Sequence, residues 1–172
     1  HSNLRRQRQM CIRDRQSALF GQNCFEFGEM KSTYGTGCFL MVNTKEKIYR
    51  SKARLLSTVG SKLGNKTSYA LEGSIFSAGT SIQWLRDEMR FFDDSVESED
   101  LINDNFDSNG VCFIPAFTGL GAPHWNSEIR GSIHGLKRDT SRIDLITSVF
   151  KAICFQTLEI LEALKLDGVS VS

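Results

Sequence analysis

The nine residues from Lys31 to Phe39 read KSTYGTGCF, and this run constrains the fold of the chain more than any other stretch. Glycine adopts backbone angles that are closed to other residues, and it lets a second backbone or a phosphate come close. Gly35, Thr36 and Gly37 therefore predict a sharp turn, after which the chain returns as a strand. Consecutive amides in such a turn form a concave site for an anion, with a threonine hydroxyl beside them. A phosphate-binding loop and a plain hairpin turn are equally compatible with this segment by itself.

Several short strands, one turn and one short helix are predicted from local composition. Cys38 to Val42 is a continuous apolar run that is typical of a buried strand. Asn43 to Glu46 is composed of turn-forming residues, and Ala18 to Phe25 has the apolar spacing of a short helix. Further strands are predicted at Lys47–Tyr49, Leu55–Val59, Ser68–Leu71, Val111–Ala116 and Ser132–Leu136.

A first long helix is predicted over Ser74 to Phe92, where apolar residues recur at three- and four-residue steps. Gly79 lies inside this segment, although glycine in a helix costs about 1 kcal/mol relative to alanine. A neighbouring group therefore needs the space of the missing side chain, and that group is either a closely packed element or a ligand. Asp93 to Phe106 is polar and acidic, which predicts a short surface helix and a loop.

A second long helix is predicted to begin after Ser141, which can cap it, with Asp144 in its first turn. Asp167 and Gly168 close this helix. Its buried side is predicted to consist of Ile143, Ile146, Val149, Phe150, Ile153, Leu158, Leu161 and Leu164. Val169 to Ser172 has the composition of a further strand, so we expect the chain to be a fragment.

Strands followed by helices that alternate with strands indicate an α/β fold. Two glycines and a proline make Phe117 to Trp125 an irregular loop. His124 in this loop is a conceivable general base, but a single loop histidine without a visible partner is typical of a structural residue. We therefore assign it no catalytic role.

Charge and cysteine content exclude several classes of function. Residues 1–15 contain five arginines and one aspartate, so they carry +4, and the total of +1 leaves −3 for residues 16–172. A slightly acidic body argues against nucleic-acid binding, and no apolar run approaches the roughly 20 residues that span a bilayer. The cysteines form neither a disulfide framework nor a zinc pattern, so no metal site is predicted and a cytoplasmic protein is expected. They are Cys11, Cys24, Cys38, Cys112 and Cys154.

Several collinear stretches resemble the bacterial-type glycerol kinases of the FGGY carbohydrate kinase family. They are Ser17–Gln22, Thr33–Phe39, Tyr69–Gly73, Ser81–Met89 and Pro115–Pro123. Gly131 to Phe150 also resembles the second signature of the family, with Lys151 where the family usually carries an acidic residue or glutamine. By this resemblance, residues 16–172 are expected to be the first part of the C-terminal nucleotide-binding domain. Residues 1–15 are expected to be a basic tail outside the family, disordered or foreign.

The resemblance implies a partial actin/hexokinase-like, or ribonuclease H-like, ATPase domain of the α/β class. Kinases of this family have two domains with a cleft between them. The longer parent is expected to phosphorylate glycerol to sn-glycerol 3-phosphate, with ATP and Mg²⁺. The chain by itself is expected to be inactive because it lacks the first domain. The resemblance leaves a homo-oligomeric parent open.

The resemblance also implies roles for five residues near the nucleotide. Thr36 corresponds to the threonine that contacts the ATP phosphates, and Gly35 and Gly37 shape its turn. Gly79 and Gln83 correspond to helix positions that approach the nucleotide. In this interpretation, a side chain at Gly79 would block the ligand.

Two residues are assigned to the substrate in the same way. Phe39 corresponds to an aromatic residue that flanks the carbon backbone of glycerol. Asp14 stands where the family has its catalytic carboxylate, which accepts the proton of the attacking hydroxyl. Arg13 and Arg15 flank it where the family has glycine and a glutamine that binds glycerol, so the sequence departs from the family here.

Two alternatives remain open at this point. A kinase of the same family with another substrate, such as xylulose or gluconate, is the first, although Trp84–Asp87 and Phe117–Pro123 resemble the glycerol kinases more. A module that binds a nucleotide without catalysis is the second. The upstream sequence would distinguish between the substrates, because sugar choice is determined mainly in the first domain.

Overall fold

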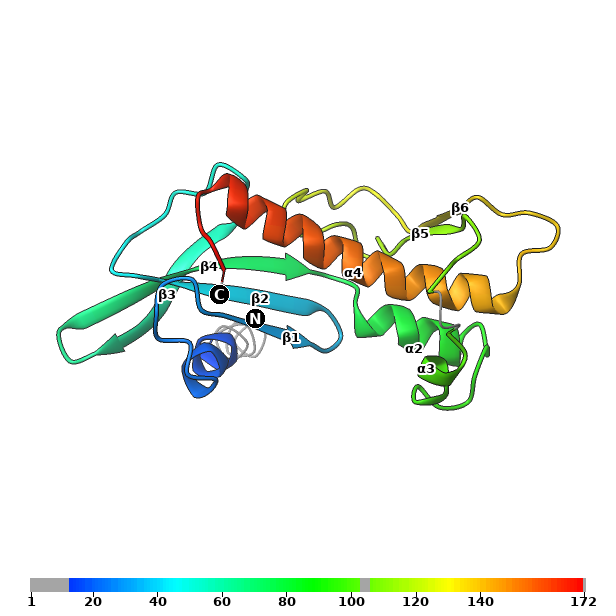
Figure 1. Ribbon diagram of the computed structural model, residues 1–172, viewed down its shortest axis with the longest axis horizontal. Helices are drawn as coiled ribbons and strands as arrows, with labels where there is room; N and C mark the ends of the chain where they lie inside the picture. Colours follow the sequence, from blue (N-terminus) through cyan, green and yellow to red (C-terminus); the bar gives the residue numbers. More distant parts are fainter. Residues whose placement is uncertain (1–12, 103–105, 172) are drawn as a thin grey trace, which may run out of the picture. The chain divides into compact units, whose positions relative to one another are not determined.

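The computed structural model describes residues 13–102 and 106–171, which form two compact units (Figure 1). The first unit consists of residues 13–33, Phe39–Ser74 and 160–171. The second unit consists of Tyr34–Cys38 and Ile75–Glu159. Helices and strands occur together, which confirms the predicted α/β class.

A four-stranded sheet forms the body of the first unit. Its strands are β1 (Met30–Tyr34), β2 (Cys38–Lys45), β3 (Leu56–Leu63) and β4 (Lys66–Ile75), in the spatial order β1-β2-β4-β3. β2 lies in the interior of the sheet, and Leu40, Met41 and Val42 are at most 1% exposed. The predicted buried strand is therefore confirmed.

β3 and β4 form an antiparallel hairpin. Leu63 pairs with Lys66 across a tight turn, in which Gly64 has a φ of 58°. A left-handed backbone of this kind favours glycine because it has no Cβ. Residues 13–21 are helical and contribute to a small core under the sheet. This core contains Leu19, Cys24, Met41 and Ala70.

Two predictions about the first unit are wrong, and a third is shifted. The turn predicted over Asn43–Glu46 lies one residue later, because β2 continues to Lys45 and the Lys47 amide donates to the Thr44 carbonyl at 3.2 Å. The polar side chain of Asn43 is satisfied there, since its Nδ2 donates to the Cys24 carbonyl at 2.7 Å and its Oδ1 accepts from the Lys45 amide at 2.7 Å. Lys47–Tyr49 form no strand. The helix predicted over Ala18–Phe25 ends at Gly21, and residues 13–17 before it are also helical.

The second unit contains the remaining short elements and most of a long helix. These are α2 (Gly79–Asp87), α3 (Glu97–Asp100), β5 (Cys112–Ile114), β6 (Ser132–His134) and the part of α4 (Arg142–Leu166) that precedes Ile160. β5 and β6 pair in antiparallel register. Trp84 stacks on Phe113 in the core of the second unit, with 5.9 Å between the ring centroids. The buried residues of this core are Leu85, Phe92, Phe113, Ile146, Val149 and Ala152.

The helix predicted over Ser74 to Phe92 is much shorter than expected, since α2 has nine residues. Ser74 is a residue of β4, which continues to Ile75. Phe92 is buried in the core beyond the end of the helix. The predicted helical spacing arose because apolar residues of a strand, a helix and a loop happen to recur at three- and four-residue steps. Gly79 is the first residue of α2 rather than an interior one.

α4 begins and ends as its terminal residues predict. The Ser141 hydroxyl accepts from the Asp144 amide at 3.2 Å, and the Asp144 carboxylate accepts from the Ser141 amide at 2.7 Å. This reciprocal pair is a capping box. Gly168 follows the helix with a φ of 74°. Leu158 is 49% exposed, so its predicted burial is wrong, and Ile160 is buried instead. Residues 169–171 form no strand.

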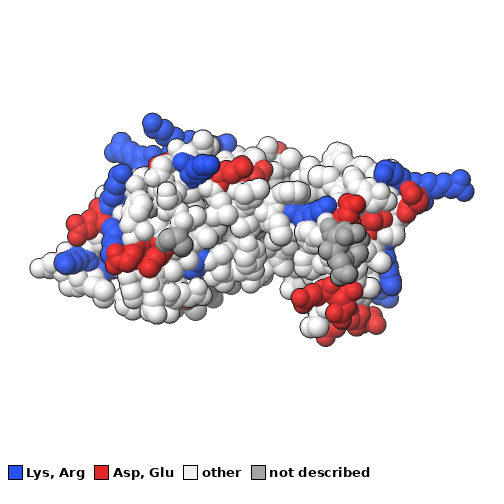
Figure 2. Space-filling model, in the orientation of Figure 1, with Lys and Arg blue, Asp and Glu red and all other residues white. Residues whose placement is uncertain are grey.

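Charged side chains of both signs occur on the face shown in Figure 2, with large uncharged areas between them. The acidic residues predicted between Asp93 and Phe106 include those of α3, whose Glu97, Glu99 and Asp100 are exposed. Within residues 13–102 and 106–171, no helix is long and apolar enough to cross a membrane.

Candidate active site

The Gly-Thr-Gly segment forms a tight loop between β1 and β2, within the second unit. The Gly35 amide donates to the Gly37 carbonyl at 2.8 Å, which closes the loop. Gly35 and Thr36 are exposed, whereas Gly37 and Cys38 are buried. The predicted sharp turn is confirmed, and Thr36 lies at its exposed tip.

The loop is fixed to the N-terminus of α2 by its own carbonyl groups. The Thr36 carbonyl accepts from the amides of Ala78 and Thr80 at 3.1 and 3.0 Å, and from the Thr80 hydroxyl at 2.8 Å. The Gly35 carbonyl accepts from the Gly79 amide at 2.9 Å. Amides at a helix N-terminus have no partner within the helix and often bind anions. Here these three amides donate to the loop carbonyls instead.

Where the loop meets α2, Gly37 and Gly79 are required by close backbone contacts. A Cβ on Gly79 would lie 2.4 Å from the Gly35 carbonyl oxygen, and a Cβ on Gly37 would lie 2.3 Å from the Ile75 carbonyl oxygen. A side chain at either position would force the backbone to shift. Packing of the loop on the helix is therefore sufficient to explain Gly79, without a ligand. Gln83 is exposed on α2, one turn after Gly79.

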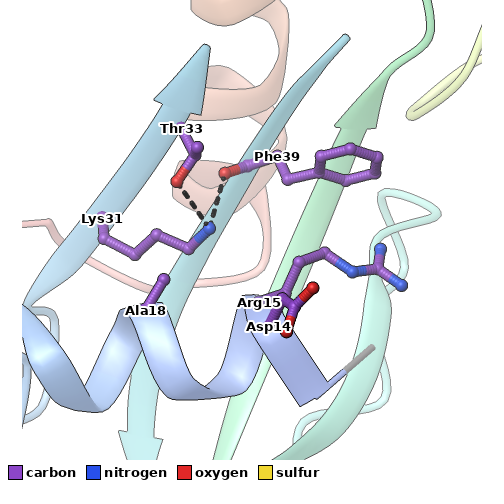
Figure 3. A pocket seen from close by; sticks show the side chains of 6 residues that line it. All are labelled: Asp14, Arg15, Ala18, Lys31, Thr33 and Phe39. Atoms are coloured by element: carbon purple, nitrogen blue, oxygen red, sulfur yellow. Dashed lines mark hydrogen bonds between the residues drawn. The ribbon is translucent and has the colours of Figure 1, made fainter. Parts of the chain in front are cut away.

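A cavity of about 340 Å³ lies in the first unit, between the helical segment and the sheet (Figure 3). The helical segment contributes Asp14, Arg15 and Ala18 to its wall, β1 contributes Lys31 and Thr33, and β2 contributes Phe39. The cavity thus brings together Asp14 and Phe39, the two residues that the sequence assigns to the substrate.

Lys31 is a member of this wall to which the sequence assigned no role. Its side chain is almost completely buried, with 2% of the residue exposed. The ammonium group donates to the Thr33 hydroxyl at 3.0 Å and to the Phe39 carbonyl at 3.2 Å (Figure 3). A buried ammonium is costly unless it is hydrogen-bonded. Lys31 therefore connects β1 to β2 directly at the residue that carries the aromatic wall.

Arg15 approaches the same aromatic ring. Its guanidinium carbon lies 4.7 Å from the centroid of Phe39, within the range of a cation–π contact. The guanidinium also forms an ion pair with Glu72, whose carboxylate accepts from the Ser74 hydroxyl at 3.3 Å. Asp14 is exposed on the helical segment. The arginine that replaces the family's glutamine thus lies against the predicted substrate wall.

His124 has a partner that the sequence did not reveal. Its Nε2 lies 3.1 Å from the Glu159 carboxylate, and both side chains are 43% exposed. They line a second cavity of about 290 Å³ in the second unit, together with Gln156. The pair connects the irregular loop to α4. The structural role predicted for His124 stays a prediction, because it was inferred without knowledge of this partner.

Within residues 13–102 and 106–171, three side chains have pKa values that depart from the ordinary range. Burial raises the pKa of the Cys24 thiol, nearby Glu29 raises it further, and Lys31 opposes the shift. At the end of α2, hydrogen bonds from Arg86 lower the pKa of the Asp87 carboxyl and raise that of the Arg86 guanidinium.

The described cysteines Cys24, Cys38, Cys112 and Cys154 are free thiols, and Cys11 lies outside the described residues. Across the described ranges, no group of three or more His, Cys, Asp and Glu side chains is arranged to hold a metal ion.

Residues 30–172 match the sequence profile of the C-terminal domain of the FGGY family of carbohydrate kinases. The chain is 54% identical over 155 residues to glycerol kinase 1 of Pseudomonas aeruginosa, which covers 90% of this chain and 31% of that protein. Among solved structures, it is similar to Plasmodium falciparum glycerol kinase with ADP, at a TM-score of 0.84 and 42% identity. That match covers 92% of this chain and 32% of the other.

A xylulose kinase from Rhodospirillum rubrum has a similar fold, with a TM-score of 0.75 over 92% of this chain and 31% of that protein. Its sequence is 18% identical, so this likeness concerns the fold alone. The chain spans about a third of the length of the relatives it matches. These matches and the actin/hexokinase-like fold agree with the predicted resemblance.

Proposed function

This chain belongs to the FGGY family of carbohydrate kinases, and from that premise we propose that it is part of a kinase that phosphorylates glycerol. The kinase transfers the γ-phosphoryl group of ATP to glycerol, which gives ADP and sn-glycerol 3-phosphate. Residues 16–172 are the first part of its C-terminal, nucleotide-binding domain, and residues 1–15 lie outside the family. The observation that carries the proposal is the loop of Gly35, Thr36 and Gly37, which is fixed by three hydrogen bonds to the Thr36 carbonyl.

In this proposal Thr36 orients the phosphates of ATP. Its side chain is at the exposed tip of the loop, while its backbone is held by α2. Phosphoryl transfer depends mainly on positioning and on stabilisation of charge. A donor that is fixed before the nucleotide arrives needs little reorganisation during the reaction. Gly35 and Gly37 permit the turn. Gly79 and Gln83 are the positions of α2 that approach the nucleotide.

The cavity of the first unit holds the polyol. Phe39 supplies an apolar wall for the carbon backbone of glycerol, and Lys31 holds the backbone of Phe39 in place. Asp14 accepts the proton of the attacking hydroxyl, a role that typically contributes about 10²–10⁴-fold to the rate. The role of Asp14 is the one that most needs a test, because Arg15 beside it replaces the family's glutamine in the same cavity wall.

Mg²⁺ neutralises phosphate charge in reactions of this kind. The described residues offer no cluster of carboxylates for it. We therefore assign no residue of this chain to the ion, which enters with the nucleotide. The kinase is proposed to act in the cytoplasm on free glycerol.

Glycerol is preferred over xylulose or gluconate because a glycerol kinase is 54% identical over 155 residues. The xylulose kinase from Rhodospirillum rubrum shares the fold alone. A binding module without catalysis remains the second candidate, because the phosphate loop is intact irrespective of the residue at position 14.

A substrate panel tests the proposal. ADP release by a full-length kinase that carries this segment is measured with glycerol, xylulose and gluconate. We expect turnover with glycerol, and a KM for ATP that rises in Thr36→Ala and less in Thr36→Ser, which keeps the hydroxyl. Thr140→Val, in which the hydroxyl that accepts from the Lys137 amide is removed, serves as the control. Turnover with a different sugar would refute glycerol, and an unchanged KM for ATP in Thr36→Ala would remove Thr36 from the site.

A further inference from the structure

We propose that Thr80 is a positioning residue for the phosphate loop: its hydroxyl holds Thr36 in the orientation that binds ATP. The inference rests on the proposed function, because it names a second residue for the same nucleotide site. Thr80 is the second residue of α2, and it is half-buried. It contacts the loop backbone rather than the solvent-exposed side where the phosphates are proposed to lie.

The bond from the Thr80 side chain joins distant parts of the chain. Its Oγ1 donates to the Thr36 carbonyl at 2.8 Å, across 44 positions in the sequence. Threonine in the first turn of a helix usually satisfies donors and acceptors of its own helix. Here the hydroxyl reaches the loop, and its distance is the shortest of the three contacts that this carbonyl accepts.

The side chain adds something that the backbone of α2 does not supply. The amides of Ala78 and Thr80 would bind the loop with almost any residue at position 80. The Thr80 hydroxyl is a third donor to the same oxygen, and only a side chain supplies it. Since Gly79 leaves no space between helix and loop, the carbonyl of Thr36 is held against α2. Fixing this carbonyl fixes the Cα of Thr36 and hence the direction of its side chain.

Loss of the Thr80 hydroxyl should therefore affect one ligand selectively. A loop that is less ordered before binding has to be ordered by the nucleotide, and this cost weakens the nucleotide's affinity. The polyol cavity belongs to the first unit, and Thr80 does not line it. A defect in folding, in contrast, would affect both substrates.

The test uses Thr80→Val and Thr80→Ser in a full-length kinase that carries this segment. Valine has the shape of threonine without the donor, and serine keeps the donor. We expect Thr80→Val to raise the KM for ATP about two- to tenfold, the range of one hydrogen bond, with an unchanged KM for glycerol and an unchanged melting temperature. Thr80→Ser should resemble the parent. Thr140→Val, whose hydroxyl lies in the same unit but binds Lys137, is the control.

A double-mutant cycle with Thr36→Ala completes the test. If Thr80 acts through Thr36, Thr80→Val should have little further effect once the Thr36 hydroxyl is absent. An unchanged KM for ATP in Thr80→Val, or an equal rise for both substrates, would overturn the inference while glycerol turnover persists. If the parent shows no turnover with glycerol, the proposed function fails. The dissociation constant for ATP then replaces KM, and a two- to tenfold weakening in Thr80→Val is still required.

Discussion

Lys31 is the residue whose burial most needs an explanation. Lysine is almost never fully buried unless its ammonium group is paired or hydrogen-bonded. The contacts to the Thr33 hydroxyl and the Phe39 carbonyl supply such bonds and join two strands. The side chain therefore stabilises the wall of the candidate substrate cavity from within the sheet.

Replacement of Lys31 by methionine should destabilise the 172-residue chain. Methionine fills a similar volume but donates neither of these two hydrogen bonds, and a hydrogen bond that involves a charged group contributes about 1.5–3 kcal/mol. Urea unfolding measures the change. Lys66→Met is the matched control, because Lys66 is exposed at the start of β4, and surface substitutions usually change stability by less than about 0.5 kcal/mol. Equal effects of the two substitutions would show that the hydrogen bonds of Lys31 contribute nothing.

The cysteines should differ in reactivity because of burial and charge. The pKa of Cys24 is raised, so at neutral pH this thiol contains less of the reactive thiolate than an ordinary cysteine, and its reaction begins at higher pH. Cys112 and Cys154 are exposed. Alkylation with iodoacetamide at pH 7, followed by peptide mass spectrometry, should label these two before Cys24, which reacts only slowly. Urea should remove the difference; rapid labelling of Cys24 in the folded chain would contradict its burial.

At the scale of elements, the junction of the loop and α2 depends on glycine. Helix propensity predicts that Gly79→Ala stabilises α2 by up to about 1 kcal/mol. The contact of 2.4 Å with the Gly35 carbonyl opposes this, and overpacking costs about 1–3 kcal/mol. Because the obstacle is backbone rather than a mobile side chain, we expect the clash to dominate.

Gly79→Ala should therefore lower the midpoint of urea unfolding of the chain and raise the KM for ATP of a full-length kinase that carries this segment. Gly21→Ala is the control, since a Cβ at Gly21 meets nothing within 4 Å in the helical segment. That substitution should be neutral or stabilising. If alanine is tolerated equally at both positions, the loop is not packed on α2 as described.

Local signals predicted several elements correctly. The capping residues Ser141 and Asp144 and the glycine at position 168 placed both ends of α4, because caps depend on neighbouring residues. The apolar run of β2 likewise identified a strand buried on both faces. These features are determined within a few residues of the chain.

Other features depend on contacts between distant residues. The boundary between β4 and α2 was missed, because Ile75 continues a helical period while it pairs in a sheet. Thr80 carries no signal of its bond to Thr36, which lies 44 positions earlier. Gly35, Thr36, Gly37, Gly79 and Gln83 were selected by resemblance, and the structure brings the loop and the start of α2 together. Their roles toward ATP stay predictions, as do those of Asp14 and Phe39.

For the whole molecule, size limits what this chain can do. It spans 31% of the length of glycerol kinase 1 of Pseudomonas aeruginosa. Phosphoryl transfer to a polyol requires a closed site that excludes water. We therefore predict that the purified chain shows no ADP release above background with glycerol and Mg-ATP. Turnover by the chain alone would contradict the expectation that the reaction requires the first domain of the kinase as well.

The central claim concerns the loop at Thr36 and its place on the nucleotide. A crystal structure of a full-length kinase carrying this segment, with a non-hydrolysable ATP analogue, would examine it directly. We predict that the Thr36 hydroxyl lies within hydrogen-bonding distance of a phosphate oxygen, while the amides of Ala78, Gly79 and Thr80 remain bound to the loop carbonyls. An analogue bound at another place, with the loop free of phosphate, would contradict the account.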